Sequence, residues 1–352
     1  MRVLVAGHHG YIGSVMVPVL SATGHTLSGL DTFFFEGSSF TADLPTSAVA
    51  SARNDVRDLR PNDLDGFDAV IDLAWISDNP DRKPRTVPIG EINHDGAIHL
   101  AQRASEAGVK RFLFASSCAV YGTAPDHVTL REDAPLRPVT PDAIWKVRAE
   151  EGILRLANSS FSPVIMRSAT AYGVSPRLRV DGVFNRLVCD AHSTGRIRID
   201  SQGTPWRPLV HVEDIAYAFA AALTAPREAV HGQVFNVGAN SENYQLSELA
   251  EIVRSAVPGS SIDYSPEPDP TPLSYRVDFG KMTKAFAAFR PRWNASFGAK
   301  DLYAFLQEVG VPPADLQGRR YDRGAQLQYL VETGTLNAQL RFGHPTVAAS
   351  RG

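Results

Sequence analysis

The sequence predicts a doubly wound α/β fold, in which helices cover both faces of a parallel sheet and a smaller C-terminal lobe is built on it. Short, continuous apolar runs rich in β-branched residues recur through the first half of the 352 residues, and segments of helical periodicity lie between them. Such runs are typical of strands that are buried on both faces. Alternation of strands with helices favours a parallel sheet.

The expected elements divide the chain into two parts. The first part, residues 1–175, holds strands at 3–6, 27–30, 69–73, 112–115 and 163–166 and helices that include 92–107 and 141–156. The second part, residues 176–352, holds a strand at 196–199, a turn at 203–205, helices at 214–223 and 246–256, a surface loop at 258–272 and two helical patterns within 300–342. We expect it to form a substrate-binding lobe with a C-terminal helical extension, which covers the carboxyl ends of the strands, where such sheets bind ligands.

The composition excludes several classes of protein. An apolar fraction of 43% with 21% charged residues can bury a full core, which argues against disorder. A net charge of −3 offers no basic excess for nucleic acid. Cys118 and Cys189 lie too far apart for a short metal knuckle and fit a reducing compartment. No run of eighteen apolar residues exists, and Gly7–Gly10 interrupts the first apolar stretch, so neither a membrane span nor a signal peptide is expected. These features predict a cytoplasmic protein with a small-molecule substrate, no metal and no nucleic-acid or membrane partner, with a homodimer as one possible assembly.

The first fourteen residues, MRVLVAGHHGYIGS, combine a strand, a glycine-rich turn and a helix that opens at Tyr11. Glycines are needed there because the turn is tight, the backbone must approach a pyrophosphate, and the helix must pack close to its strand. The helix N-terminus adds N–H donors and the positive end of its dipole. The pattern predicts a dinucleotide site along this turn, formed by Gly7, His9, Gly10, Tyr11, Ile12 and Gly13.

The choice between the two nicotinamide dinucleotides depends on residues at the end of the second strand. Asp31 lies eighteen residues beyond Gly13, where a carboxylate accepts the ribose hydroxyls of NAD and repels the extra phosphate of NADP. His9 lies near the place of that phosphate, and a histidine that donates to phosphate gains charge. We therefore expect NADP(H) or NAD(H) as the cofactor, with dual use left open.

Further motifs follow the glycine turn in a specific order. They are Asp55-Val56-Arg57-Asp58, Leu73-Ala74, Asn93, Ser116-Ser117, Val120-Tyr121-Gly122 and the run RPLVHVED at 207–214. With the glycine turn, they resemble the extended short-chain dehydrogenase/reductases, the NAD-dependent epimerase/dehydratase family of sugar-nucleotide enzymes, over essentially the whole chain. The resemblance implies a Rossmann fold, adenine contacts from Asp55 and Val56, and further cofactor contacts from Leu73 and Ala74. The Gly-His-His-Gly turn is also similar to that of GDP-fucose synthases, which use NADP.

The sequence departs from this family at its catalytic centre. Family chemistry uses a serine and a Tyr-x-x-x-Lys pair, in which the phenol exchanges a proton with the reacting oxygen and the lysine lowers the phenol's pKa and holds the nicotinamide ribose. The resemblance assigns Ser117 and Lys146 to the serine and lysine positions. None of the six lysines has a tyrosine four residues before it, and Asp142 holds that place before Lys146.

Three functions remain compatible with this loss. Asp142 can replace the phenol as base in a sugar-nucleotide 4-epimerase or 4,6-dehydratase, although an ionised carboxylate donates no proton unless burial raises its pKa. The chain can also be a non-catalytic nucleotide-binding scaffold. The preferred prediction is an NAD(P)H-dependent ketoreductase of a bulky aromatic polyketide ketone in antibiotic biosynthesis. A phenol beside such a ketone supplies the proton. In lacking the tyrosine, the sequence resembles the tyrosine-free angucyclinone ketoreductase of this family.

A second departure concerns the substrate. Sugar-nucleotide relatives clamp a diphosphate with an arginine in the loop before the final strand of the lobe, but residues 255–275 contain neither Arg nor Lys and offer Pro272 and Leu273 instead. Arg207 keeps the other clamp position, and Arg276 is the available substitute. The aromatic residues expected near the substrate, most of them for packing, are Phe33–Phe35, Trp75, Trp145 and Trp206.

Overall fold

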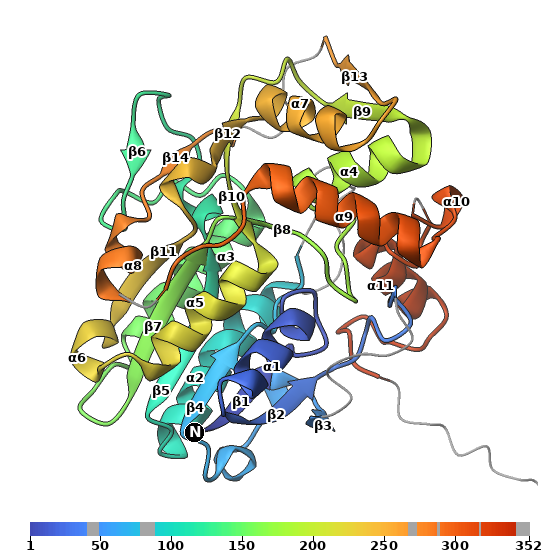
Figure 1. Ribbon diagram of the computed structural model, residues 1–352. Helices are drawn as coiled ribbons and strands as arrows, with labels where there is room; N and C mark the ends of the chain where they lie inside the picture. Colours follow the sequence, from blue (N-terminus) through green and yellow to red (C-terminus); the bar gives the residue numbers. More distant parts are fainter. Residues whose placement is uncertain (41–48, 78–88, 267–272, 287–288, 317, 343–352) are drawn as a thin grey trace, which may run out of the picture.

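The computed structural model describes residues 1–40, 49–77, 89–266, 273–286, 289–316 and 318–342. Its centre is a seven-stranded parallel sheet with the strand order β11-β7-β5-β4-β1-β2-β3 (Figure 1). The strands are β1 (Arg2–Ala6), β2 (Thr26–Asp31), β3 (Ala50–Arg53), β4 (Ala69–Asp72), β5 (Arg111–Ser117), β7 (Ser162–Ser168) and β11 (Gln233–Val237). The predicted doubly wound α/β fold is confirmed.

Helices cover both faces of this sheet. On one face α1 (Gly13–Ala22) and α5 (Val212–Thr224) pack on side chains that include Val3 and Val5. On the other face α2 (Gly96–Glu106) and α3 (Pro141–Leu154) pack on side chains that include Leu4 and Ala6. Because successive residues of a strand point to opposite faces, β1 serves both cores and reads as a continuous apolar run.

All five expected strands of the first part are present, and two further strands of the central sheet, β3 and β11, were not expected. The edge strand β3 is fully exposed and consists of Ala, Ser, Ala and Arg, which carry little strand signal. Helix α1 is assigned from Gly13, two residues after the predicted opening at Tyr11, although the Ser14 N–H already donates to the Gly10 carbonyl at 3.0 Å.

The smaller lobe is built on a second core. Helices α4 (Val183–Thr194), α7 (Leu246–Ala256) and α9 (Ala295–Val309) surround it. Its strands are β8 (Thr170–Tyr172), β9 (Arg196–Ile199), β10 (Trp206–His211), β12 (Asn243–Gln245) and β13 (Ser261–Tyr264), while β6 (Thr129–Leu130) pairs with β14 (Arg276–Val277). The remaining helices are α6 (Arg227–Val230), α8 (Gly280–Ala285), α10 (Pro313–Leu316) and α11 (Arg323–Glu332), and the short turns of helix lie at Val56–Asp58, Pro61–Leu64, Glu91–Asp95, Cys118–Tyr121 and Asn240–Glu242.

Two details of the second part differ from the sequence prediction. The expected surface loop at 258–272 contains β13, which pairs in parallel with β9, while 267–272 lie outside the described residues. Strand β11 returns to the central sheet beside β7, so residues beyond 176 complete the sheet of the first part. The division of the chain at residue 175 stays a prediction.

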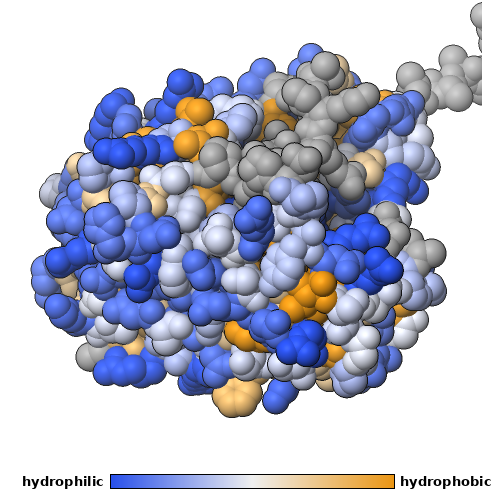
Figure 2. Space-filling view, turned by 90° about the horizontal axis from the view of Figure 1, so that it is seen from above, coloured by the Kyte–Doolittle hydropathy of each residue, from blue (hydrophilic) through white to orange (hydrophobic). Residues whose placement is uncertain are grey.

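The surface seen from above is mostly hydrophilic and carries small, separate hydrophobic areas (Figure 2). Within the described parts of the chain, no helix is both long and apolar enough to cross a membrane. Both cysteines are buried free thiols. The expected absence of a metal, the cytoplasmic location and the homodimer stay predictions.

Candidate active site

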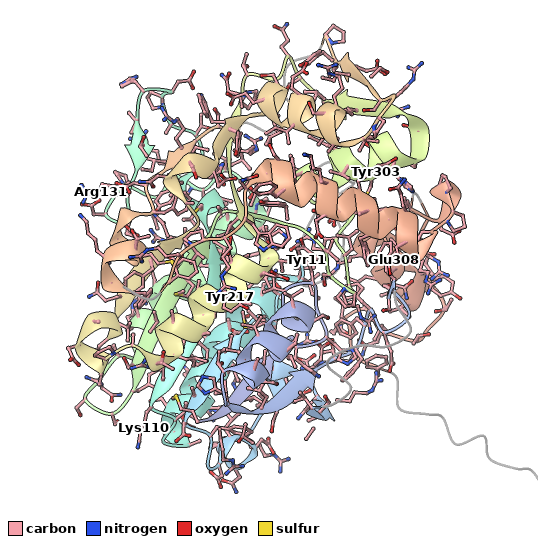
Figure 3. All side chains as sticks on the ribbon, viewed as in Figure 1. Tyr11, Lys110, Arg131, Tyr217, Tyr303 and Glu308 are labelled. Atoms are coloured by element: carbon pink, nitrogen blue, oxygen red, sulfur yellow. The ribbon has the colours of Figure 1, made fainter. Side chains whose placement is uncertain are left out.

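A cavity of about 410 Å³ lies at the carboxyl ends of β1, β2, β4 and β5. It is lined by every residue that the sequence predicted for cofactor binding or catalysis: Gly7, His9, Gly10, Tyr11, Ile12, Gly13, Asp31, Asp55, Val56, Leu73, Ala74, Ser117, Asp142 and Lys146. Tyr11 lies near the centre of the molecule, between α1 and α9, whereas Lys110 and Arg131 lie at its periphery (Figure 3). Parallel pairing of β1 with β2 and β4 brings these segments to one edge of the sheet.

The glycine turn forms a narrow cradle against the end of β4. Gly7 has a φ of +79°, and a Cβ placed on it would lie 2.7 Å from the Leu73 carbonyl carbon. A Cβ on Gly13 would lie 2.4 Å from the Gly7 carbonyl oxygen. Neither site tolerates a side chain. At Gly10 an added Cβ would meet one backbone atom, the Gly7 oxygen at 3.1 Å, so backbone is exposed where α1 begins. These features fit the diphosphate of a dinucleotide.

Backbone N–H groups hold Asp31 at the end of β2. One carboxylate oxygen accepts from the His9 N–H at 3.1 Å and the other accepts from the Phe33 N–H at 2.8 Å. Phe33 has the left-handed φ of +60°, which closes this turn around the carboxylate. The carboxylate is therefore fixed beside the glycine turn, where the ribose of a bound dinucleotide lies in this fold.

His9 differs in charge from the sequence prediction. Burial, together with the neighbouring His8 and Arg177, lowers the pKa of His9 to about 4. Its Nδ1 accepts from Arg177 at 3.2 Å, which requires a neutral ring. The cation nearest this end of the site is therefore Arg177, and sequence reasoning did not single it out.

Asp55 is engaged by two arginines. Its carboxylate accepts from the Arg57 guanidinium at 2.7 and 3.0 Å and pairs with Arg341 at 3.2 Å. Arg341 also pairs with Asp58. Val56 is buried in the core beneath α2. The adenine contacts that the family resemblance implies for Asp55 and Val56 stay proposals.

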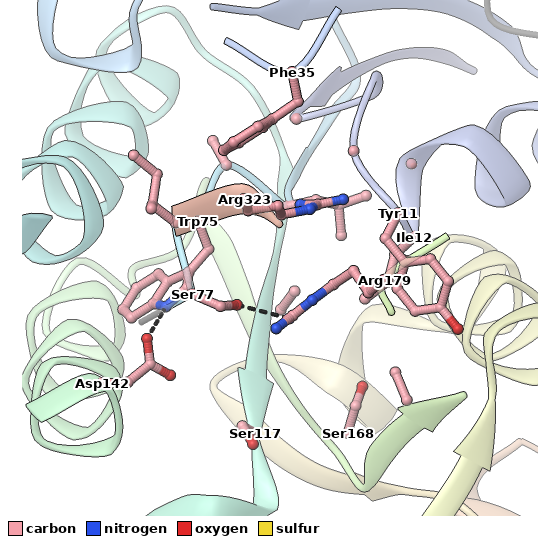
Figure 4. Close-up of a pocket in the computed structure, with 18 of the residues that line it drawn as sticks. Tyr11, Ile12, Phe35, Trp75, Ser77, Ser117, Asp142, Ser168, Arg179 and Arg323 are labelled. Carbon is pink, nitrogen blue, oxygen red and sulfur yellow. Dashed lines mark hydrogen bonds between the residues drawn. The ribbon is translucent and has the colours of Figure 1, made fainter. Parts of the chain in front are cut away.

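The catalytic end of the cavity brings Asp142, Lys146 and Trp75 together. Asp142 Oδ1 accepts from the indole Nε1 of Trp75 at 2.6 Å (Figure 4). Lys146 Nζ donates to the Ala115 carbonyl and lies 3.3 Å from the centroid of the Trp75 ring. Burial lowers the pKa of Lys146 to about 8, although the charges of Asp142 and Asp72 oppose that shift. The Ser117 hydroxyl accepts from the Ala119 N–H at 3.1 Å.

A buried network fixes the helix that carries Lys146. Glu150, one turn further along α3, pairs with Arg167 of β7 at 2.6 Å. It also accepts a hydrogen bond from the Ser116 hydroxyl of β5. Helix α3 is thereby held to two neighbouring strands, and the Lys146 ammonium is held at the end of β5.

The tyrosines that line the cavity come from segments distant in sequence from Lys146. Among the described residues, Tyr11 and Tyr275 are the tyrosines that line it. Tyr11 lies on the opposite side from Asp142 (Figure 4), and its hydroxyl donates to the Gly173 carbonyl at 2.9 Å. Burial raises the pKa of both phenols. The group beside Lys146 is a carboxylate that the Trp75 indole already holds.

Several lining residues come from distant segments and were missed by sequence reasoning. Arg179 pairs with Asp181 at 2.8 Å and donates to the Ser77 hydroxyl at 2.8 Å. Arg323 enters the cavity from α11. None of these three charges belongs to a recognisable local motif, so only the fold brings them to the site.

The predicted clamp residues are only partly at the site. Arg207 and Leu273 line the cavity, and the Arg207 guanidinium donates to the Leu273 carbonyl. Arg276 does not compensate for the missing loop arginine, because its guanidinium lies 4.8 Å from the Trp206 ring and is not part of the lining. Of the predicted aromatic residues, Phe33–Phe35 and Trp75 line the cavity, whereas Trp145 and Trp206 do not.

The fold and the cavity together define a dinucleotide-dependent enzyme of the doubly wound α/β class. The model of the NAD dependent epimerase/dehydratase family matches residues 3–238, and the chain belongs to this family. Family membership confirms a nicotinamide dinucleotide as cofactor and an oxidoreductase-type enzyme rather than an inert scaffold. The choice between NAD(H) and NADP(H) stays a prediction.

Curated relatives and solved structures agree with this assignment. A UDP-glucose 4-epimerase of Mycolicibacterium smegmatis is 31% identical over 275 residues, which cover 73% of this chain and 83% of the relative. A UDP-N-acetyl-alpha-D-glucosaminuronate decarboxylase of Bacillus cytotoxicus is 25% identical and covers 88% of this chain and 98% of its own. In structure, a UDP-glucuronic acid 4-epimerase of Bacillus cereus, solved with UDP-glucuronic acid and NAD, is similar with a TM-score of 0.77 and 22% identity over 88% of this chain and 100% of its own. DesIV, a dTDP-glucose 4,6-dehydratase of Streptomyces venezuelae solved with NAD, has a TM-score of 0.76 and 23% identity over 88% of this chain and 97% of its own.

Proposed function

We propose that this enzyme is an NAD(P)H-dependent ketoreductase that reduces a bulky aromatic ketone in one direction. The observation that carries the proposal is the hydrogen bond from the Trp75 indole to Asp142 beside Lys146. Hydrogen bonds to a carboxylate stabilise its ionised form. Asp142 is thus a poor proton donor. It is also a weak base, because the Trp75 indole and the Lys146 ammonium already stabilise its negative charge.

Reduction tolerates this arrangement better than oxidation does. The bound dinucleotide supplies a hydride to the carbonyl carbon. An epimerase or dehydratase must first remove the proton of an alcohol, which needs a base on the enzyme. A reductase needs one proton for the developing alkoxide, and a hydroxyl next to the ketone on an aromatic polyketide supplies it. In this proposal Lys146 holds the cofactor ribose, and Ser117, which lines the cavity, either polarises the carbonyl or only borders its site.

The walls of the cavity suit an aromatic substrate. Phe33, Phe34, Phe35 and Trp75 line it, together with Ile76 and Leu273. Flat apolar side chains favour ring systems through burial and stacking. A substrate of the angucyclinone type, as in simocyclinone assembly, fits this chemistry.

The second candidate is a sugar-nucleotide 4-epimerase, 4,6-dehydratase or decarboxylase with Asp142 as its base. The comparisons favour it over the polyketide reductase, because the relatives include a UDP-glucose 4-epimerase and a UDP-sugar decarboxylase, and the similar structures include a dTDP-glucose 4,6-dehydratase. Arg207, at the family's clamp position in the cavity, adds support. Against it stands the chemistry beside Lys146, where the Asp142 carboxylate that would act as the base already accepts a hydrogen bond from the Trp75 indole.

Turnover with externally supplied NADPH separates the two candidates. The ketoreductase consumes one NADPH for each molecule of an ortho-hydroxy aromatic ketone and leaves UDP-glucose and dTDP-glucose unchanged. The sugar-nucleotide enzyme converts a sugar nucleotide with no net consumption of added cofactor. Conversion of a sugar nucleotide together with inertness toward aromatic ketones would refute the reductase proposal.

A further inference from the structure

The C-terminal segment, residues 318–342, contacts the turn that follows β3 and supplies Arg323 to the lining of the cavity. The Arg57 guanidinium donates to the Gln339 carbonyl at 3.0 Å, and Arg341 pairs with Asp55 at 3.2 Å. Leu340 is fully buried in a cluster that includes Phe34. Ion pairs and apolar packing therefore fix this segment to the rim of the dinucleotide site.

Arg323, at the start of α11, extends from this segment into the cavity. Its guanidinium lies 5.0 Å from the centroid of the Phe35 ring and donates weakly to the Arg177 carbonyl at 3.4 Å. Within the described residues, no carboxylate lies within ion-pair distance of it. Burial and the neighbouring charge of Arg179 lower the pKa of Arg323 to about 10, so the group is still a cation at neutral pH.

A second cation lies on the same side of the cavity. Arg179 keeps its ion pair with Asp181, and Figure 4 shows Arg323 between Phe35 and Arg179, whose guanidinium extends toward Ser77. The charges of Arg179 and Arg177 act on Arg323 together with those of Asp181 and Asp31, which oppose them. The N-terminus of α1 adds its N–H donors at the same place.

Buried cations of like charge are stable when an anion lies between them. The charges follow the order in which a dinucleotide crosses this fold: Asp31 at the ribose end, the arginine pair over the glycine turn, and Lys146 at the catalytic end. We infer that Arg323 and Arg179 hold the diphosphate bridge of the cofactor. The C-terminal segment thereby completes a site that the glycine turn alone leaves open on one side. This assignment concerns the cofactor and is independent of which substrate is reduced.

Calorimetric titration with two cofactor fragments tests the assignment. ADP-ribose carries the diphosphate and lacks the 2′-phosphate, whereas adenosine 2′-monophosphate carries the 2′-phosphate and lacks the diphosphate. We expect Arg323→Met to weaken ADP-ribose binding about 10- to 100-fold, the usual effect of a lost charge-assisted hydrogen bond, and to leave adenosine 2′-monophosphate binding unchanged. Arg323→Lys should restore part of the ADP-ribose affinity.

The matched control is Arg319→Met, because Arg319 lies in the same segment, stacks 3.6 Å from the Tyr329 ring centroid and is absent from the cavity lining. The Arg319→Met variant should bind both fragments with the affinity of the unmodified enzyme. Weakened binding of adenosine 2′-monophosphate alone would make Arg323 a 2′-phosphate ligand and overturn the assignment. Unchanged binding of both fragments by Arg323→Met would also overturn the assignment. Equal weakening of both fragments without rescue by Arg323→Lys would overturn it too, because it would indicate a structural role for Arg323.

Discussion

At the scale of single residues, Asp142 and its hydrogen bond from Trp75 distinguish the candidate reactions. The sequence predicts that a carboxylate replaces the family's phenol, because position 142 lies one helical turn before Lys146. It gives no sign that the Trp75 indole binds that carboxylate, because the two residues are 67 positions apart and only the fold joins them. The indole contact makes an acid role for Asp142 unfavourable, and the proposed reductase rests on this point.

The charge of Asp31 should set cofactor preference. Asp31→Asn removes the negative charge and keeps an oxygen to accept one of the two backbone N–H groups. We expect the affinity for NADPH relative to NADH to rise about tenfold, or about 1.4 kcal/mol, because a repulsive charge beside the 2′-phosphate is lost. Titration of both cofactors measures the ratio. An unchanged ratio would place the 2′-phosphate elsewhere.

The ionisation of Lys146 should limit activity at alkaline pH. Burial holds its pKa at about 8, below the ordinary value of 10.5, so the ammonium loses its proton as pH rises through about 8. We expect kcat/KM for NADPH to fall over that interval, because the neutral amine holds the ribose hydroxyls less strongly. In Lys146→Arg the group stays charged, and the profile should be flat up to pH 10 at a lower maximum. A wild-type profile that is flat up to pH 10 would contradict this role.

At the scale of elements, the sequence predicts the helices and strands whose own residues carry a clear apolar pattern. The strands buried on both faces and α7, observed at Leu246–Ala256 as expected, carry continuous apolar or helical patterns. The exposed strand β3 was not predicted, because its residues have a weak strand propensity. The strand β11 was not predicted, because it joins the central sheet by pairing with β7, which is distant in sequence. The glycine turn was predicted because steric limits at Gly7 and Gly13 act locally.

Attachment of α3 to the sheet depends on the buried Glu150–Arg167 pair. Glu150→Gln leaves the Arg167 guanidinium buried without its carboxylate, which usually costs about 3–5 kcal/mol of unfolding free energy. We expect a matching decrease in the denaturation midpoint. The double variant Glu150→Gln with Arg167→Met should recover part of the loss, since no unpaired charge remains. Equal stability of the single variant and the unmodified enzyme would show that the pair is not a determinant of α3 docking.

At the scale of the whole molecule, the site is assembled from both parts of the chain. Every residue that the sequence assigned to cofactor binding or catalysis lines the cavity, and these residues lie within the first 146 positions. The lobe contributes Arg179, Arg207 and Arg323, and only Arg207 stands in a recognisable motif. Long-range topology brings the other two to the cavity, so a single sequence cannot place them.

Ligands that bind the cavity should stabilise the whole enzyme. A ligand that binds only the folded state raises stability by about 2.7 kcal/mol at a concentration 100 times its Kd. We expect NADPH to raise Tm and a polycyclic aromatic ketone to raise it further in the presence of the cofactor. UDP-glucose and dTDP-glucose should have little effect, because residues 255–275 supply no cation for their diphosphate. A clear shift with a sugar nucleotide would support the epimerase candidate instead.

The source of the proton is tested most directly by NADPH consumption in Asp142→Asn with two substrates, an ortho-hydroxy aromatic ketone and its methyl ether. Asparagine preserves the size of the side chain and the oxygen that accepts from Trp75. Loss of an essential proton-transfer group costs about 10²- to 10⁴-fold in rate. The substrate-assisted mechanism predicts that Asp142→Asn reduces the hydroxy ketone within about tenfold of the unmodified rate and that neither enzyme reduces the methyl ether. An inactive Asp142→Asn, together with reduction of the methyl ether by the unmodified enzyme, would show that Asp142 has taken over the role of the tyrosine.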